Sequence, residues 1–153
     1  MKIHLMFSLL MIAGSSCNPV PDPCRGSILK ERAKDGVLRP ILYLDERGCI
    51  ACSRRFAHLC ETYYDATEVQ LVLRATGAQV DISAFIGPDD KRVKWDDDGS
   101  VAQCLGLQGS SAIFFASDGS VDTIVTVGAK TLDQDFDYIL SRLPSQAESL
   151  PRP

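Results

Sequence analysis

The sequence predicts an α/β domain in which a parallel strand–helix–strand unit is followed by a short helix, a β-hairpin and a last helix. The apolar run at Arg39–Leu44 leads to a helical pattern from Cys52 to about Tyr64, and a second apolar run follows at Val69–Leu73. This order implies two parallel strands joined by a crossover helix. Asp118-Gly119 lies between two runs rich in β-forming residues, which indicates the hairpin.

The first helix is recognised by the spacing of its apolar residues. Phe56, Leu59, Cys60 and Tyr63 recur at i, i+3, i+4 and i+7, so they share one face. The stretch from Thr76 to Asp98 is less regular, and at most one helical turn is expected there.

The acidic run before the second helix is interpreted as a solvated turn. The acids at Asp96–Asp98 are consecutive, whereas calcium loops alternate their ligands. Ser100 is expected to cap a short helix that buries Val101, Cys104 and Leu105 on one face and ends at Gly106.

The last three elements are two strands and a helix. The strands are expected at Ala112–Phe115 and Val121–Val127, and the helix from about Thr131. The residues expected to be buried by this helix are Phe136, Ile139, Leu140 and Leu143.

The N-terminus has the pattern of a secretory signal peptide. Lys2 precedes the apolar segment Leu5–Ala13, which is too short to span a bilayer, and small residues lead to Cys17. Cleavage before Cys17 would give a lipidated, membrane-tethered protein, and cleavage near Gly14-Ser15 would give a chain without this anchor. Either way we expect export to a bacterial periplasm or cell envelope, because six cysteines suit an oxidising compartment.

The rest of the chain is expected to contain one domain. Residues 17–36 are interpreted as a proline-containing tether with a short helix at Ser27–Asp35, residues 37–143 as the domain, and residues 144–153 as a disordered tail. The formal net charge of −4 and the lack of a basic cluster argue against a nucleic-acid partner.

Cys49-Ile50-Ala51-Cys52 is the strongest functional motif, because it lies between the first strand and the first helix. The free N–H groups and the positive end of a helix stabilise a thiolate at its first residue. Cys49 is therefore the candidate catalytic nucleophile, and Cys52 is placed to resolve a mixed disulfide.

Three other interpretations of this pair stay open: a structural disulfide, a zinc site and a site for a soft ion. A structural disulfide of this spacing would restrain little chain, and a zinc site would need a second pair of ligands, which the sequence lacks. A soft ion such as Cu(I) is a third reading of the two thiols. The interpretation favoured is redox chemistry, with no cofactor and no resident metal.

The remaining candidate groups are given structural interpretations. Arg54 and Arg55 are interpreted as solvated charges and His58 as a surface residue. Cys60 and Cys104 lie on apolar helix faces and are expected to be buried free thiols. The state of Cys24 depends on that of Cys17: it pairs with Cys17 or remains for an intermolecular disulfide.

The chain resembles the thioredoxin superfamily, in particular its exported, membrane-tethered thiol–disulfide oxidoreductases. Three pieces carry the resemblance: the strand–Cys49-x-x-Cys52–helix unit, the segment Asp98–Leu107, and Ile113–Phe115 with Asp118–Val121. The resemblance implies a three-layer sandwich, with a mixed sheet of four or five strands between helices. It also implies protein thiols or disulfides as substrates, a redox partner protein and, if Cys17 is lipidated, membrane attachment.

The sequence departs from this family around the dithiol, so a non-catalytic thioredoxin-like binding module, in which the altered loop and rim dock a partner, is the alternative to an oxidoreductase. The loop that usually contains a cis-proline corresponds to Ser110-Ser111, which is expected to be trans and to serve as a substrate loop. Gly48 replaces an aromatic residue, and Asp45–Arg47 are expected to form a charged, open rim. The family's buried acid has no counterpart, because Tyr43 falls near its place.

Overall fold

The computed structural model describes residues 36–74, 81–83, 86–87 and 90–145. The expected signal segment at 1–16, the lipidation site Cys17, the helix at Ser27–Asp35 and nearly all of the tether and tail lie outside these ranges. The predictions for these segments therefore stay predictions.

Five strands form one mixed sheet in the order β3-β2-β1-β4-β5. β1 (Ile41–Asp45) pairs in parallel with β2 (Gln70–Arg74), and β2 pairs in parallel with β3 (Val93–Trp95). β4 (Ser111–Phe115) runs antiparallel to β1, and β5 (Val121–Thr126) runs antiparallel to β4. The parallel unit and the hairpin are confirmed, and β3 is an edge strand that the sequence did not reveal.

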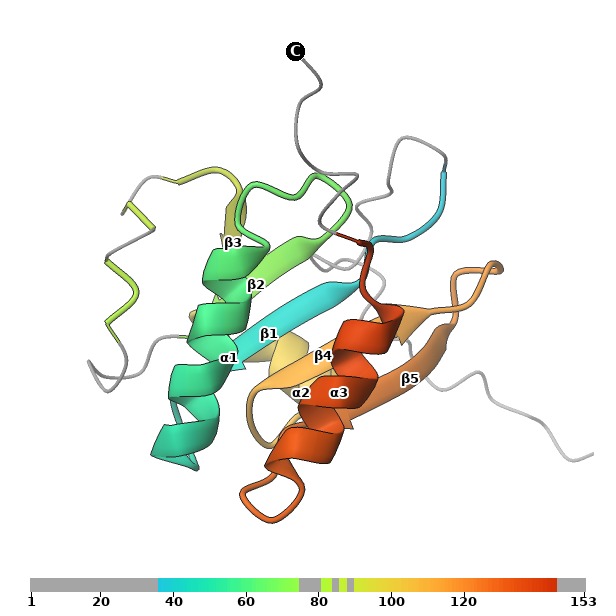
Figure 1. The fold of residues 1–153 in the computed structure, drawn as a ribbon. Helices are drawn as coiled ribbons and strands as arrows, with labels where there is room; N and C mark the ends of the chain where they lie inside the picture. The colour runs from blue at the N-terminus through green and yellow to red at the C-terminus, as the bar shows by residue number, and fades with distance from the viewer. Residues whose placement is uncertain (1–35, 75–80, 84–85, 88–89, 146–153) are drawn as a thin grey trace, which may run out of the picture.

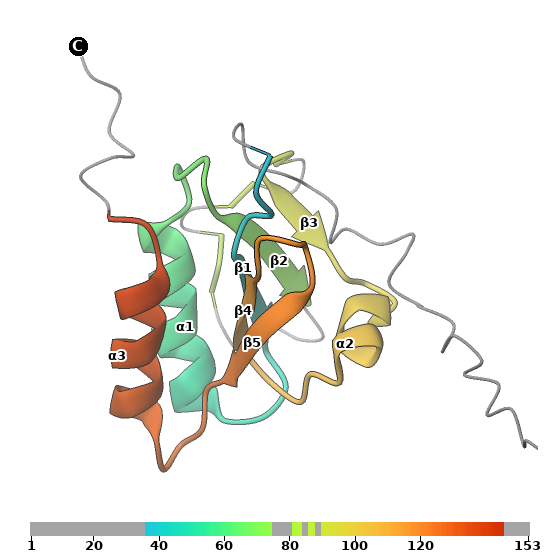
Figure 2. The same ribbon diagram turned by 90° about the vertical axis from the view of Figure 1, so that its right-hand side faces the viewer.

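The helices lie on both faces of the sheet, so the predicted α/β three-layer, thioredoxin-like fold is confirmed. α1 (Ile50–Thr62) and α3 (Leu132–Arg142) cover one face, and the short α2 (Ser100–Leu105) covers the other (Figures 1 and 2). None of the helices in the described ranges combines the length and the apolar character needed to cross a membrane.

The core is divided by the sheet because the side chains of a strand alternate between its faces. Leu42 and Leu44 of β1 pack toward α1 and α3, whereas Ile41 and Tyr43 pack in a second cluster with Val101 of α2. The carboxyl end of β1 therefore lies between two filled layers, which fixes the position of the loop that follows it.

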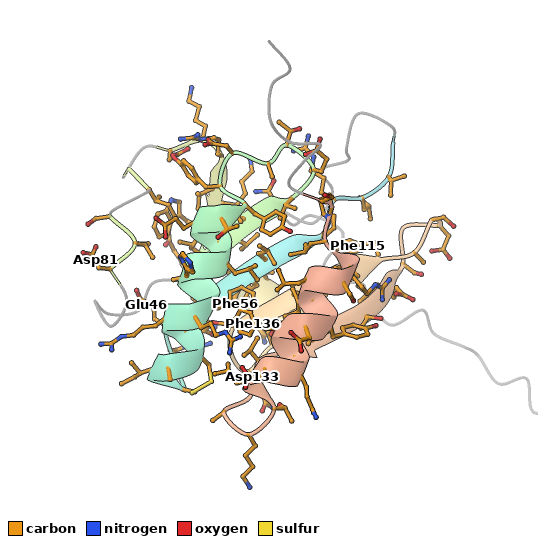
Figure 3. All side chains as sticks on the ribbon, viewed as in Figure 1. Glu46, Phe56, Asp81, Phe115, Asp133 and Phe136 are labelled. Carbon is orange, nitrogen blue, oxygen red and sulfur yellow. A yellow bond between two sulfur atoms is a disulfide. The ribbon has the colours of Figure 1, made fainter. Side chains whose placement is uncertain are left out.

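α1 and α3 are joined by an aromatic contact. The rings of Phe56 and Phe136 meet edge to face with centroids 6.2 Å apart (Figure 3), and the Arg55 guanidinium lies 4.5 Å from the centroid of Phe136. Arg55 also forms an ion pair with Asp133 at the start of α3. The expected burial of Leu140 is wrong, since 48% of this residue is exposed.

Candidate functional site: the dithiol at the start of α1

The turn between β1 and α1 places the two cysteines as the sequence predicts. Cys49 is the N-cap of α1, and its Sγ accepts a hydrogen bond from the backbone N–H of Cys52 at 3.2 Å. Gly48, with a φ of 112°, supplies the left-handed backbone that the turn requires. Cys49 and Cys52 form a disulfide, drawn in yellow at the lower end of α1 in Figure 3, with Cα atoms 5.2 Å apart.

The two sulfurs differ in environment. Cys49 is partly buried, whereas Cys52 is 3% exposed and belongs to the core cluster under α1. Ile50, beside Cys49, is 49% exposed. After reduction, the N–H of Cys52 and the helix N-terminus would stabilise negative charge on Cys49. The partly exposed Cys49 sulfur is therefore suited to attack a sulfur of another molecule, and the buried Cys52 sulfur is suited to attack the sulfur of Cys49.

The loop of Ser110 and Ser111 is attached to the end of β1. The Ser110 hydroxyl donates to the carbonyl of Asp45 at 3.1 Å and lies 3.2 Å from its N–H. The peptide bonds of this loop are trans. The Ser111 hydroxyl donates to the Gly109 carbonyl and lies 2.9 Å from the Thr126 hydroxyl. The loop thus meets the chain four residues before Cys49, and its role toward substrates stays a prediction.

The prediction of a charged, open rim at Asp45–Arg47 is wrong for its two acids. Asp45 has no exposed surface and Glu46 is 4% exposed. Asp45 is the last residue of β1, and its carboxylate accepts from the Arg47 side chain at 3.0 and 2.7 Å. This pairing raises the pKa of Arg47. Only Arg47 extends into solvent, with 46% of its side chain exposed.

Asp96 is a buried acid that the sequence analysis placed in solvent. It is 1% exposed, and its carboxylate accepts from the Tyr43 hydroxyl at 2.8 Å and from the N–H groups of Val101 and Ala102 at 2.9 and 3.2 Å. Asp96 therefore caps α2 in place of Ser100, which is the first helical residue after Gly99. The signal available in the sequence was an acid a few residues before a helix start.

Tyr43 occupies the site where the family resemblance implied an acid. It is fully buried, and burial raises the pKa of its hydroxyl, with the hydrogen bond to Asp96 as the second cause. A side-chain hydrogen bond with Arg74, at the end of β2, lowers this pKa in part. A buried carboxylate is thus present near this position, but it comes from the loop after β3.

The other two described cysteines differ from each other. Cys60 is a buried free thiol, as predicted, and burial raises its pKa. The prediction of a free thiol at Cys104 is wrong, because Cys104 is disulfide-bonded. Cys104 is only partly buried on the short α2, so a bridge is sterically accessible.

The polar residues of α1 have structural contacts. His58 is exposed and lies 3.0 Å from the carboxylate of Glu61, which confirms the surface interpretation. Arg55 is half-exposed and contacts α3, whereas Arg54 is exposed. Within the described ranges, no group of three or more His, Cys, Asp or Glu residues is placed to hold a metal ion.

Comparison of the chain with protein-family models, with curated proteins and with solved structures found no match.

Proposed function

We propose that the protein is a thiol–disulfide oxidoreductase. The observation that carries the proposal is the placement of Cys49 as the N-cap of α1, disulfide-bonded to the buried Cys52. A purely structural bridge between residues three apart would add little stability. In contrast, a partly exposed sulfur at a helix N-terminus next to a buried second sulfur is suited to exchange.

The reaction transfers two electrons from the dithiol to a substrate disulfide. The Cys49 thiolate attacks one substrate sulfur, a mixed disulfide forms, and the first substrate thiolate leaves and takes up a proton. Cys52 loses its proton and attacks Sγ of Cys49, which releases the second substrate thiol and closes the Cys49–Cys52 disulfide. The same steps in reverse oxidise a substrate dithiol, and a redox partner protein with reactive thiols would restore the starting state.

The proposed site of action is outside the cytoplasm, in a bacterial periplasm or cell envelope. The support is the signal-like pattern before Cys17 and the number of cysteines. Lipidation at Cys17 would tether the domain to the membrane through residues 18–36.

Disulfide reduction by the purified protein tests the proposal. The reduced protein should reduce insulin catalytically in the presence of dithiothreitol, and Cys49→Ser should remove this activity. Cys60→Ala, a cysteine on the same helix with no part in the exchange, is the matched control and should retain it. Activity that survives in Cys49→Ser would refute the assignment of the nucleophile.

The direction of the reaction follows from the reduction potential of the pair. Equilibration with glutathione gives this potential. A value of about −270 mV indicates a reductant, whereas a value of about −120 mV indicates an oxidant. A pair that does not exchange with glutathione would favour a thioredoxin-like binding module. Stoichiometric, chelator-sensitive Cu(I) binding would favour metal delivery.

A further inference from the structure

A polar cleft lies at the same end of the sheet as the dithiol. It has a volume of about 430 Å³ and is formed by the ends of β1 and β2, by α2 and by the loop that follows α2. In Figures 1 and 2 the β1–α1 loop and the α2–β4 loop lie side by side at this end. The polar residues that line the cleft are Arg47, Arg74, Asp98, Gln103 and Gln108. Arg47 is two residues from Cys49, so the cleft adjoins the reactive turn.

Arg74 packs closely against Gly99 on the wall of this cleft. Its guanidinium lies against Gly99, where a Cβ atom would overlap it. Gly99 also has a φ of 71°, so both the backbone and the neighbouring cation require glycine here. The Nε of Arg74 is buried and has no hydrogen-bond partner among the described residues. A buried charged donor without an acceptor is costly. Arg74 as a whole is only partly buried and lines the cleft, so a ligand bound there would meet its positive charge.

The acids near the cleft already have donors. The carboxylate of Asp45 accepts hydrogen bonds from Nε and Nη2 of Arg47, so Nη1 of that guanidinium can donate to another acceptor. Asp98 accepts from the backbone N–H of Ser100 at 2.9 Å. Asp96 is bonded to Tyr43 and to the start of α2. The cleft therefore presents two guanidinium groups, of Arg47 and Arg74, and the side-chain amides of Gln103 and Gln108, against the single carboxylate of Asp98.

We propose that this cleft binds a carboxylate of the substrate, so that the preferred substrates are peptide disulfides with an acidic side chain close to the reacting cysteine. The identity of the ligand as a disulfide rests on the proposed function, whereas the carboxylate preference rests on the cleft alone. Guanidinium groups match carboxylates in geometry as well as in charge. Since Arg47 is next to the turn of Cys49, a bound carboxylate would hold the substrate sulfur near the nucleophile.

Two matched pairs of peptides test the proposal. In each pair, one peptide has Glu and the other has Gln at the same position, two residues from the reacting residue. The peptides of the first pair contain a cysteine in a disulfide, and those of the second pair have serine in place of this cysteine. The serine peptides report binding without exchange, measured by calorimetry on the purified protein. We expect the Glu peptide to bind about fivefold to tenfold more tightly at low salt, as for a charge-assisted hydrogen bond in a partly solvated site. This ratio should approach 1 at about 1 M salt, where the Debye length is about 3 Å.

Variants assign the preference to the cleft. Arg74→Gln should reduce the Glu-to-Gln ratio to about 1, whereas Lys91→Gln removes a positive charge at the opposite end of the sheet and should leave it unchanged. The wild-type salt dependence tests the proposal even if Arg74→Gln does not fold. Equal binding of the Glu and Gln serine peptides to the wild-type protein would overturn the proposal.

Exchange rates with the disulfide peptides separate this inference from the proposed function. Faster exchange with the Glu peptide supports both. A binding preference without any exchange would refute the oxidoreductase and keep the carboxylate cleft, whereas equal binding with efficient exchange would refute only the cleft.

Discussion

Replacement of Asp96 by alanine is expected to be among the most destabilising single changes in the domain. The substitution removes the acceptor of three buried donors: the Tyr43 hydroxyl and the N–H groups of Val101 and Ala102. It also removes the cap of α2, which has only six residues and no side-chain cap from Gly99.

The magnitude follows from these contacts. Loss of a helix cap costs about 1 to 2 kcal/mol. A buried donor left without an acceptor costs about 1 to 3 kcal/mol, and the Tyr43 hydroxyl has no exposed surface. Since the two N–H groups lie at a helix end and gain access to water, we expect a total of about 3 to 5 kcal/mol. This is a large part of the about 5 to 15 kcal/mol that stabilises a typical domain.

Urea unfolding followed by the fluorescence of Trp95, the only tryptophan of the chain, measures this loss. With a slope of about 1 to 3 kcal/mol per M, the midpoint should fall by about 1 to 5 M. Asp97→Ala is the matched control, because Asp97 is exposed and should change the free energy of unfolding by less than about 0.5 kcal/mol. In the Asp96→Ala background, Tyr43→Phe should cost clearly less than in the wild type. A loss below about 1 kcal/mol for Asp96→Ala would refute the reasoning.

Three further predictions concern other buried groups. Arg47→Gln leaves the buried Asp45 carboxylate without its cation and should lower the free energy of unfolding by about 1 to 2 kcal/mol, measured in urea. This is less than for a fully buried pair, because Arg47 is half-exposed. An unchanged urea midpoint would contradict this pairing. The pKa values of Cys60 and Tyr43 are raised by burial from ordinary values of 9.0 and 10.0, so the unfolded chain ionises first as the pH rises, and stability should fall above about pH 9. Tyr43→Phe and Cys60→Ala should each reduce that fall, and a stability that stays level to pH 11 would argue against both shifts. Ser110→Ala removes the contact between the α2–β4 loop and Asp45, and it should change the rate of Cys49 alkylation in the reduced protein, whereas an unchanged rate would separate this loop from the site.

The parts of the fold predicted from the sequence are those with a clear apolar period. The face of Phe56, Leu59, Cys60 and Tyr63 is buried as expected, and the Asp118-Gly119 hairpin joins β4 to β5. β3 was missed because it has three residues, Val93–Trp95, and its pairing with β2 is a long-range contact with no local signature.

The errors at the site concern acids. Asp45, Glu46 and Asp96 were assigned to solvent because acidic residues are rarely buried without partners. Their burial depends on donors that only the tertiary structure supplies, such as Tyr43 for Asp96 and the folded-back side chain of Arg47 for Asp45. In contrast, the geometry of Cys49 and Cys52 was predictable, because it depends on a local strand–helix junction.

The central claim is that Cys49 is the nucleophile of a redox-active dithiol, and trapping of the mixed disulfide tests it most directly. Cys52→Ser, incubated in reduced form with a peptide disulfide, should accumulate one peptide bonded to Cys49, identified by mass spectrometry of the digested protein. Cys49→Ser should accumulate little adduct, because Cys52 is 3% exposed. An adduct that forms at Cys52 in preference to Cys49, or no adduct in either variant, would contradict the account.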